Sequence, residues 1–306
     1  LRILFRVFSS LKMKLKIKAI FLFLFFLCGQ VFYADEFSAL DFPAGKEKLA
    51  QYFKEAMEKA RQKVEKVGGA PAIPFTTTIV YCETEKEFLQ KAGMNPEHFI
   101  AAANAAQAVI YLNGERLRAL NPDENFGVLV HEYAHLFVGR QAVEPLPRWL
   151  DEGLAMLLAG EWSLGKSIQM AMAHLWGNHI PFSRLESSFP ASPPELSLAY
   201  LQSCSMCQFL IRQFFARGGI SAMLKILADP EQGRKFIAQL DEPIIMKSLE
   251  EQWKKYLGNR WWNIIFLFSS GTIFWFAMTL FFLLAYLKKR KQKLEQIKVW
   301  EEEGFF

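Results

Sequence analysis

Two histidines one helical turn apart place the strongest constraint on what this chain of 306 residues can build. His131 and His135 flank Glu132 in the segment HEYAH. The segment follows residues 121–124 (NPDE), which combine an N-cap, a proline and a glutamate typical of a helix start. Residues four apart on a helix share one face and lie about 5–6 Å apart, so both imidazoles can bind one metal ion. The sequence therefore predicts a helix that offers two metal ligands.

Glu132 borders the same helix face, where it can accept a proton from an activated water molecule without binding the metal itself. So short a motif also occurs by chance. An alternative therefore stays open, in which His131 and His135 are surface or core histidines one turn apart.

A third ligand is expected from a second helix. Catalytic zinc sites use three protein ligands and keep one position open. Glu152 lies seventeen positions after His135, within residues 147–155 (PRWLDEGLA), and a proline opens that segment. Gly and Pro in residues 139–146 suit a reversal of the chain. An antiparallel helix would bring Glu152 against the two imidazoles, whereas the adjacent Asp151 is expected on a solvated face about 100° away.

These two segments resemble those of the gluzincin metallopeptidases, in which a HExxH helix is followed by a helix bearing W-L-x-E-G-x-A. The similarity is closest to the peptidase MA-like branch and covers roughly residues 75–257. It implies that His131, His135 and Glu152 bind Zn²⁺ and that Glu132 is the general base. It also implies an α+β, zincin-like fold, with a small mixed sheet packed on the HExxH helix and a mostly helical C-terminal part.

The sheet is expected from two segments rich in β-branched and aromatic residues. These are residues 75–82 (FTTTIVYC) and 107–112 (QAVIYL), and they follow an amphipathic helical pattern over residues 45–67. In the resembling family an edge strand pairs with extended substrate, and residues 107–112 occupy the position of that strand. Such pairing is β-augmentation, which recognises the backbone more than the side chains.

A donor that stabilises the reaction's oxyanion is expected near the metal. The resemblance places a tyrosine at Tyr200, although a helix-core role within the apolar residues 196–210 is an equal alternative. His174 and His179 are further candidates, and we favour surface or structural roles for both.

Cysteine usage gives little functional information. Cys204 and Cys207 form a C-x-x-C pair inside an apolar helical pattern, unlike the helix start of a redox motif. We interpret them, with Cys82, as buried thiols, while a disulfide stays an alternative.

The two ends of the chain carry topogenic patterns. Four lysines precede the apolar residues 19–27, which predicts a signal peptide or hydrophobic anchor over residues 1–34. Residues 1–12 are interpreted as a start-site artefact or an upstream extension. Residues 261–287 lack any charge, exceed the roughly 20 residues that cross a bilayer, and precede a basic cluster at 288–293. This predicts one transmembrane helix; a buried core helix is the alternative.

Together these patterns predict an outer peptidase domain at residues 35–260, a span at 261–287 and a cytoplasmic tail at 288–306. The chain has 36 basic and 31 acidic residues, and the excess of basic residues lies at its two ends. We therefore expect no nucleic-acid partner.

The predicted function is that of a membrane-anchored zinc metallopeptidase whose substrate is a peptide or protein. The alternative is a membrane-tethered binding domain that keeps the fold without cleaving peptides. A binding domain has no need of Glu132, so its presence favours the enzyme.

Overall fold

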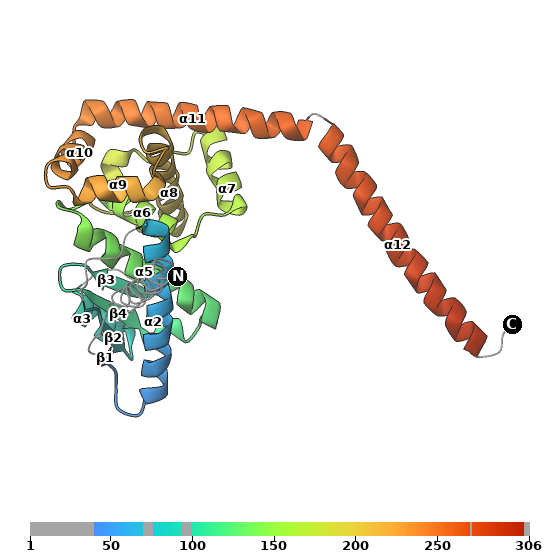
Figure 1. Ribbon diagram of the computed structural model, residues 1–306, viewed down its shortest axis with the longest axis horizontal. Coiled ribbons are helices and arrows are strands. Elements are labelled where there is room, and N and C mark those ends of the chain that lie inside the picture. Colours follow the sequence, from blue (N-terminus) through green and yellow to red (C-terminus); the bar gives the residue numbers. More distant parts are fainter. Residues whose placement is uncertain (1–39, 70–75, 94–98, 270, 303–306) are drawn as a thin grey trace, which may run out of the picture.

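The computed structural model describes residues 40–69, 76–93, 99–269 and 271–302 (Figure 1). Its strands are β1 (Leu40–Asp41), β2 (Thr78–Cys82), β3 (Ala101–Asn104) and β4 (Val109–Asn113). Its helices are α2 (Glu47–Gly68), α3 (Glu85–Ala92), α4 (Gly114–Leu117), α5 (Pro122–Gln141), α6 (Arg148–Ala159), α7 (Leu164–Leu175), the 3-10 helix η1 (Phe182–Leu185), α8 (Pro193–Phe214), α9 (Gly219–Ala228), α10 (Gln232–Leu240), α11 (Pro243–Ser269) and α12 (Thr272–Glu302). The predicted combination of a small sheet and a mostly helical C-terminal part is confirmed for these residues.

The sheet is mixed, with the strand order β1-β2-β4-β3 in the described residues. β1, β2 and β4 run parallel, whereas β3 pairs antiparallel with β4, with Ala101 opposite Leu112. The prediction that residues 107–112 form the edge strand is wrong, because β4 pairs with β2 on one side and with β3 on the other. The edge strand on that side of the sheet is β3, whose sequence AAAN lacks the branched and aromatic residues that mark strands.

The start of α5 is defined by a capping box. The Asn121 side chain accepts a hydrogen bond from the Glu124 backbone N–H at 3.0 Å, and the Glu124 carboxylate accepts one from the Asn121 N–H at 2.9 Å. Pro122 opens the helix, where its missing N–H costs nothing. The predicted start of this helix is confirmed.

α5 lies between the sheet and the helical layer, and it packs against α2, α6, β3 and β4 (Figure 1). Its core face is apolar and buried, comprising Leu129, Val130, Tyr133, Ala134, Leu136, Phe137 and Val138. This burial fixes the rotation of the helix about its axis. His131 and His135 are therefore held on the remaining, partly exposed face.

A glycine permits the close contact between α6 and α8. A Cβ built on Gly153 would collide with the Cys207 sulfur and with the Ser203 carbonyl oxygen. Cys207 also lies 3.7 Å from the Leu150 carbonyl oxygen, to which its thiol donates. Cys82, Cys204 and Cys207 are free and buried, as predicted.

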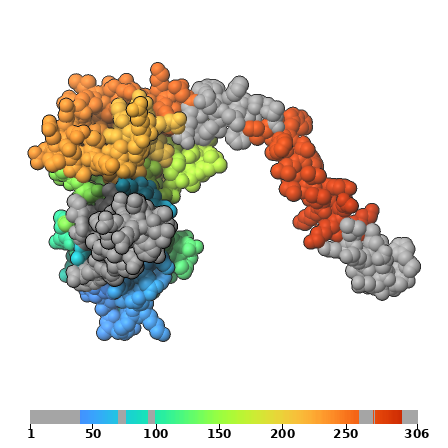
Figure 2. Space-filling view, viewed as in Figure 1, coloured from blue at the N-terminus to red at the C-terminus, as the bar shows by residue number. Residues whose placement is uncertain are grey.

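The prediction of a transmembrane helix at residues 261–287 is wrong. The uncharged segment is divided, because α11 ends at Ser269, Gly271 adopts a φ of 60°, and α12 begins at Thr272. Over the residues that the structure describes, no helix combines the length and apolar character that crossing a membrane requires. The predicted localisation as a single-pass membrane protein with a cytoplasmic C-terminus depended on that helix and is therefore wrong as well. In Figure 2 the described part of α12 projects away from the other helices.

The predicted signal segment at residues 1–34 lies outside the described residues. The same holds for the first five residues of the predicted 35–260 domain, so its N-terminal boundary stays a prediction.

We predict that Gly153→Ala lowers the free energy of unfolding by about 1–3 kcal/mol, because the added methyl group overpacks the α6–α8 contact. Chemical denaturation of the full chain measures the change. Gly127→Ala is the matched control, since it also lies in a helix but its added Cβ meets no atom within 4 Å. Equal denaturation midpoints for the two variants would contradict the packing argument.

Candidate metal centre

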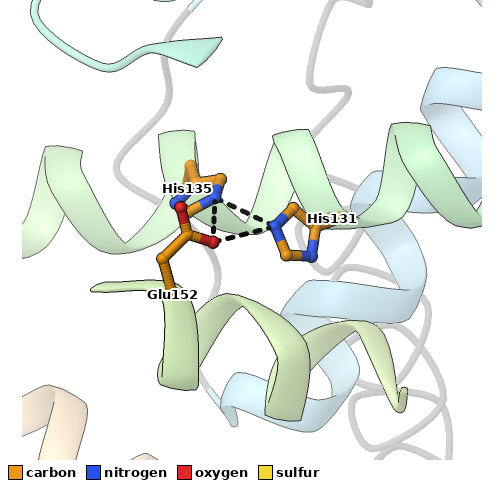
Figure 3. Close-up of side chains that lie close together, drawn as sticks. All are labelled: His131, His135 and Glu152. Atoms are coloured by element: carbon orange, nitrogen blue, oxygen red, sulfur yellow. Dashed lines mark hydrogen bonds and ion pairs between the residues drawn. The ribbon is translucent and has the colours of Figure 1, made fainter. Parts of the chain in front are cut away.

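The two imidazoles of α5 converge on one point. The Nε2 atoms of His131 and His135 lie 3.1 Å apart, and the ring centroids are separated by 4.8 Å. In Figure 3 these two nitrogens converge beside a carboxylate oxygen of Glu152. The spacing predicted from the i, i+4 pattern is thus realised with both rings directed at the same place.

α6 supplies the third group. One Glu152 carboxylate oxygen lies 3.3 Å from His131 Nε2 and 3.5 Å from His135 Nε2 (Figure 3). One ligand atom from each of the three residues falls within 4.8 Å of the others. Two imidazole nitrogens and one carboxylate oxygen form a donor set that suits Zn²⁺ and leaves a position open. The chemistry of the residues present therefore fits a metal ion.

Two further carboxylates hold the outer nitrogens of the imidazoles. His131 Nδ1 donates to Glu161 at 2.6 Å, and His135 Nδ1 forms an ion pair with Asp151 at 3.0 Å. Carboxylates in such positions orient histidine ligands and raise their basicity. The prediction that Asp151 lies on a solvated face is wrong, because α6 packs so closely on α5 that its side chain reaches His135.

Glu161 was not identified from the sequence. It follows Gly160, which takes a left-handed φ of 73° and ends α6 at Ala159. The Glu161 N–H donates to the Met156 carbonyl at 3.0 Å, and this turn directs the chain back toward α5. A glycine at a helix end is a recognisable stop signal. That signal could have indicated the turn, although not the partner of the side chain.

The carboxylates of the centre strongly affect the pKa values of its two histidines. Burial alone lowers the pKa of His131, but hydrogen bonds with Glu152 and Glu161 outweigh it and raise this pKa to about 9. For His135, burial is likewise outweighed by the charges of Asp151 and Glu152, so its pKa is also raised. A metal ion must displace protons from both rings, and its affinity is therefore expected to fall as the pH falls.

Glu152 carries a buried charge that several cations stabilise. Its side chain is 2% exposed. Burial raises the pKa of this carboxyl, but His135, His131 and Arg148 lower it well below its usual range. The Arg148 guanidinium contributes an ion pair of 2.6 Å to the second carboxylate oxygen. Glu152 is thus held ionised, in the form that binds metal.

Glu132 lies beside the three candidate ligands without joining their cluster. It is buried, and burial raises the pKa of its carboxyl above the ordinary value. Positive charge on the two neighbouring histidines opposes this rise. A carboxylate with a raised pKa is better matched to accepting a proton near neutral pH.

The centre opens into a cleft of about 1500 Å³. The edge strand β3 contributes to one wall and α8 to another, and His131, Glu132, His135, Glu152 and Tyr200 all line it. Tyr200 packs edge-on against Phe189, with ring centroids 5.1 Å apart. Burial is the main cause that raises the pKa of the Tyr200 hydroxyl, and the negative charge of Glu152 adds to it. The hydroxyl therefore stays protonated and can donate a hydrogen bond.

The other histidine candidates lie apart from this cleft. His174 Nδ1 and His179 Nε2 are 3.1 Å from each other, and His179 packs on Trp253 at 5.4 Å between ring centroids. Neither residue lines the cleft. The structure therefore favours the structural roles expected for them.

The candidate metal centre consists of two imidazole nitrogens and one carboxylate oxygen, and it lines a large cleft. Metal centres of this composition are used in catalysis. A family profile described as the Peptidase MA superfamily matches residues 59–259, a segment that contains both α5 and α6. The match covers more than half of the chain, so the chain belongs to the Peptidase MA superfamily. A comparison with curated proteins found no match.

We predict that Glu161→Gln weakens metal binding by about 10–100-fold, because the neutral amide no longer raises the basicity of His131. Competition with a chromophoric chelator measures the affinity of the full chain. Asp123→Asn is the matched control, since this carboxylate is exposed and belongs to the first turn of α5. Equal affinities for the two variants would show that Glu161 does not support the ligand.

Proposed function

We propose that this chain is a zinc metallopeptidase. The observation that carries the proposal is the convergence of His131, His135 and Glu152 within one ligand cluster at the floor of the cleft. Membership of the Peptidase MA superfamily supports a hydrolase that acts on peptide bonds. In the proposal these three residues hold Zn²⁺, and the substrate is a peptide or protein.

The ion would supply the Lewis acidity that polarises a scissile carbonyl and makes water acidic enough to be deprotonated near neutral pH. The role of the chain is to hold it with one position open. The carboxylates of Asp151 and Glu161 support the imidazoles, and Arg148 occupies the second Glu152 oxygen. Glu152 then presents a single oxygen to the ligand cluster.

Glu132 is the proposed general base. It takes a proton from the attacking water molecule and delivers it to the nitrogen of the departing amine. Its burial beside the cleft and its raised pKa support this role. Proton transfer by a positioned carboxylate typically contributes about 10²–10⁴-fold to the rate.

Tyr200 is the proposed oxyanion donor. Its hydroxyl stays protonated, and the residue lines the same cleft as Glu132. Hydrogen bonds aimed at the charge that develops in the transition state are strongest in a site that excludes water.

The substrate is proposed to pair with β3 through its backbone. β3 is the strand of the described sheet that has one free side and also lines the cleft. An extended peptide can add to such an edge by β-augmentation. Residues 107–112, to which the sequence analysis gave this role, form the neighbouring interior strand.

We predict that Glu132→Gln reduces peptide hydrolysis by about 10²–10⁴-fold while leaving zinc content nearly unchanged, because it removes the base but no ligand. Glu152→Gln is the matched variant: it should lose zinc together with activity. Elemental analysis and turnover of a quenched peptide library measure both effects. Near-normal turnover by the Glu132 variant would contradict the proposed mechanism. Zinc binding without any turnover in the wild-type chain would favour a binding domain that keeps this fold.

We predict that Tyr200→Phe lowers kcat by about 10²–10³-fold and leaves KM within a few-fold, because the lost hydrogen bond forms only in the transition state. The ring contact with Phe189 survives this substitution, so folding is preserved. Steady-state kinetics separate the two constants. A change confined to KM would assign Tyr200 to substrate binding instead.

A further inference from the structure

We propose that the cleft acts on internal peptide bonds, so that the chain is an endopeptidase that needs neither a free N-terminus nor a free C-terminus on its substrate. The inference deepens the proposed function and rests on it. It is carried by two independent observations: the pairing of the charged groups that line the described cleft, apart from Glu132, and the position of the metal centre along the cleft.

An exopeptidase has to recognise a chain end. A substrate α-amino group or α-carboxylate is charged at neutral pH, and its transfer into a protein cleft requires an opposite charge that is available to pair with it. An exopeptidase cleft therefore needs a carboxylate or a cation that is not already engaged elsewhere.

The carboxylates of the cleft wall are engaged. Among the described lining residues, Glu152 pairs with Arg148 at 2.6 Å and with both ligand imidazoles. Asp151 pairs with His135 at 3.0 Å, and Glu161 pairs with His131 at 2.6 Å.

Two further acids line the cleft. Glu144 forms an ion pair of 3.0 Å with Arg234, outside the ligand cluster. Glu132 has no ion pair among the described residues, but it is the proposed proton acceptor. A substrate ammonium group paired with its carboxylate would occupy the oxygens that have to accept the proton. No acid of the described wall is therefore left to anchor a substrate N-terminus.

The cations of the wall are engaged as well. Arg148 is committed to Glu152, and Lys166 lies 3.3 Å from Glu161. Arg148 holds the second Glu152 oxygen, so its diversion to a substrate carboxylate would leave that buried oxygen without its ion pair. The described wall thus offers no spare cation for a substrate C-terminus.

The position of the centre gives the second observation. The lining residues extend along α5 from Gly127 to Gly139, a distance of about 18 Å at 1.5 Å per residue. His131 and His135 lie between these limits, with about one helical turn beyond each of them. An extended peptide advances about 3.3 Å per residue, so the cleft has room for substrate on both sides of the centre.

The uncommitted groups of the wall suit an internal segment. They include the free side of β3, whose small alanines leave space, and apolar side chains such as Val128, Leu146, Phe189 and Leu196. These groups offer backbone pairing and apolar contact, which any interior stretch of an extended chain can use. We therefore expect apolar residues beside the bond that is cut.

The test compares one apolar decapeptide in four forms: with free ends, N-acetylated, C-amidated, and blocked at both ends. The zinc-loaded full chain is expected to cleave all four with kcat/KM values within about twofold of one another. Mass spectrometry should show internal cleavage and no ladder of single residues. A loss of about tenfold or more on acetylation or amidation, or a single-residue ladder, would overturn the inference.

Glu132→Gln supplies the background rate in the same assay. Turnover above this background that requires a free chain end would contradict the endopeptidase inference alone. A wild-type rate equal to that of the variant with all four forms would instead contradict the proposed peptidase function. The two failures are thereby separated.

Discussion

The ionised, buried side chain of Glu152 is the constraint on which the rest of the site depends. A carboxylate at 2% exposure is costly unless cations surround it, and here Arg148 and the two imidazoles do so. That requirement fixes α6 against the face of α5 that carries His131 and His135. The close approach of α8 through Gly153 then holds α6 in place. The packing of α6 against α8 thus helps to determine the geometry of the candidate centre.

Most of the ligand cluster could be predicted from the sequence, because helical periodicity is a local property. The positions of His131 and His135 follow from the i, i+4 pattern, and the capping box fixes where their helix begins. The supporting carboxylates could not be predicted, because their contacts depend on how closely two helices approach. The 100° offset between Asp151 and Glu152 describes directions on a single helix. It does not show whether the Asp151 side chain can reach His135 across the interface between α5 and α6.

The fold was predicted less completely, for two physical reasons. β3 consists of AAAN and becomes a strand through its pairing with β4, so tertiary contacts override its weak propensity. Residues 261–287 have the composition of a membrane span, but composition does not reveal where a helix ends. A single glycine with a left-handed φ, Gly271, lies between α11 and α12 and divides the apolar segment.

The most direct test of this account is anomalous diffraction at the zinc absorption edge from crystals of the zinc-loaded full chain. The account predicts one strong peak at the floor of the cleft, about 2.0–2.2 Å from the Nε2 atoms of His131 and His135 and from a Glu152 carboxylate oxygen. The absence of a peak there, or a dominant peak at another site such as the His174–His179 pair, would contradict it.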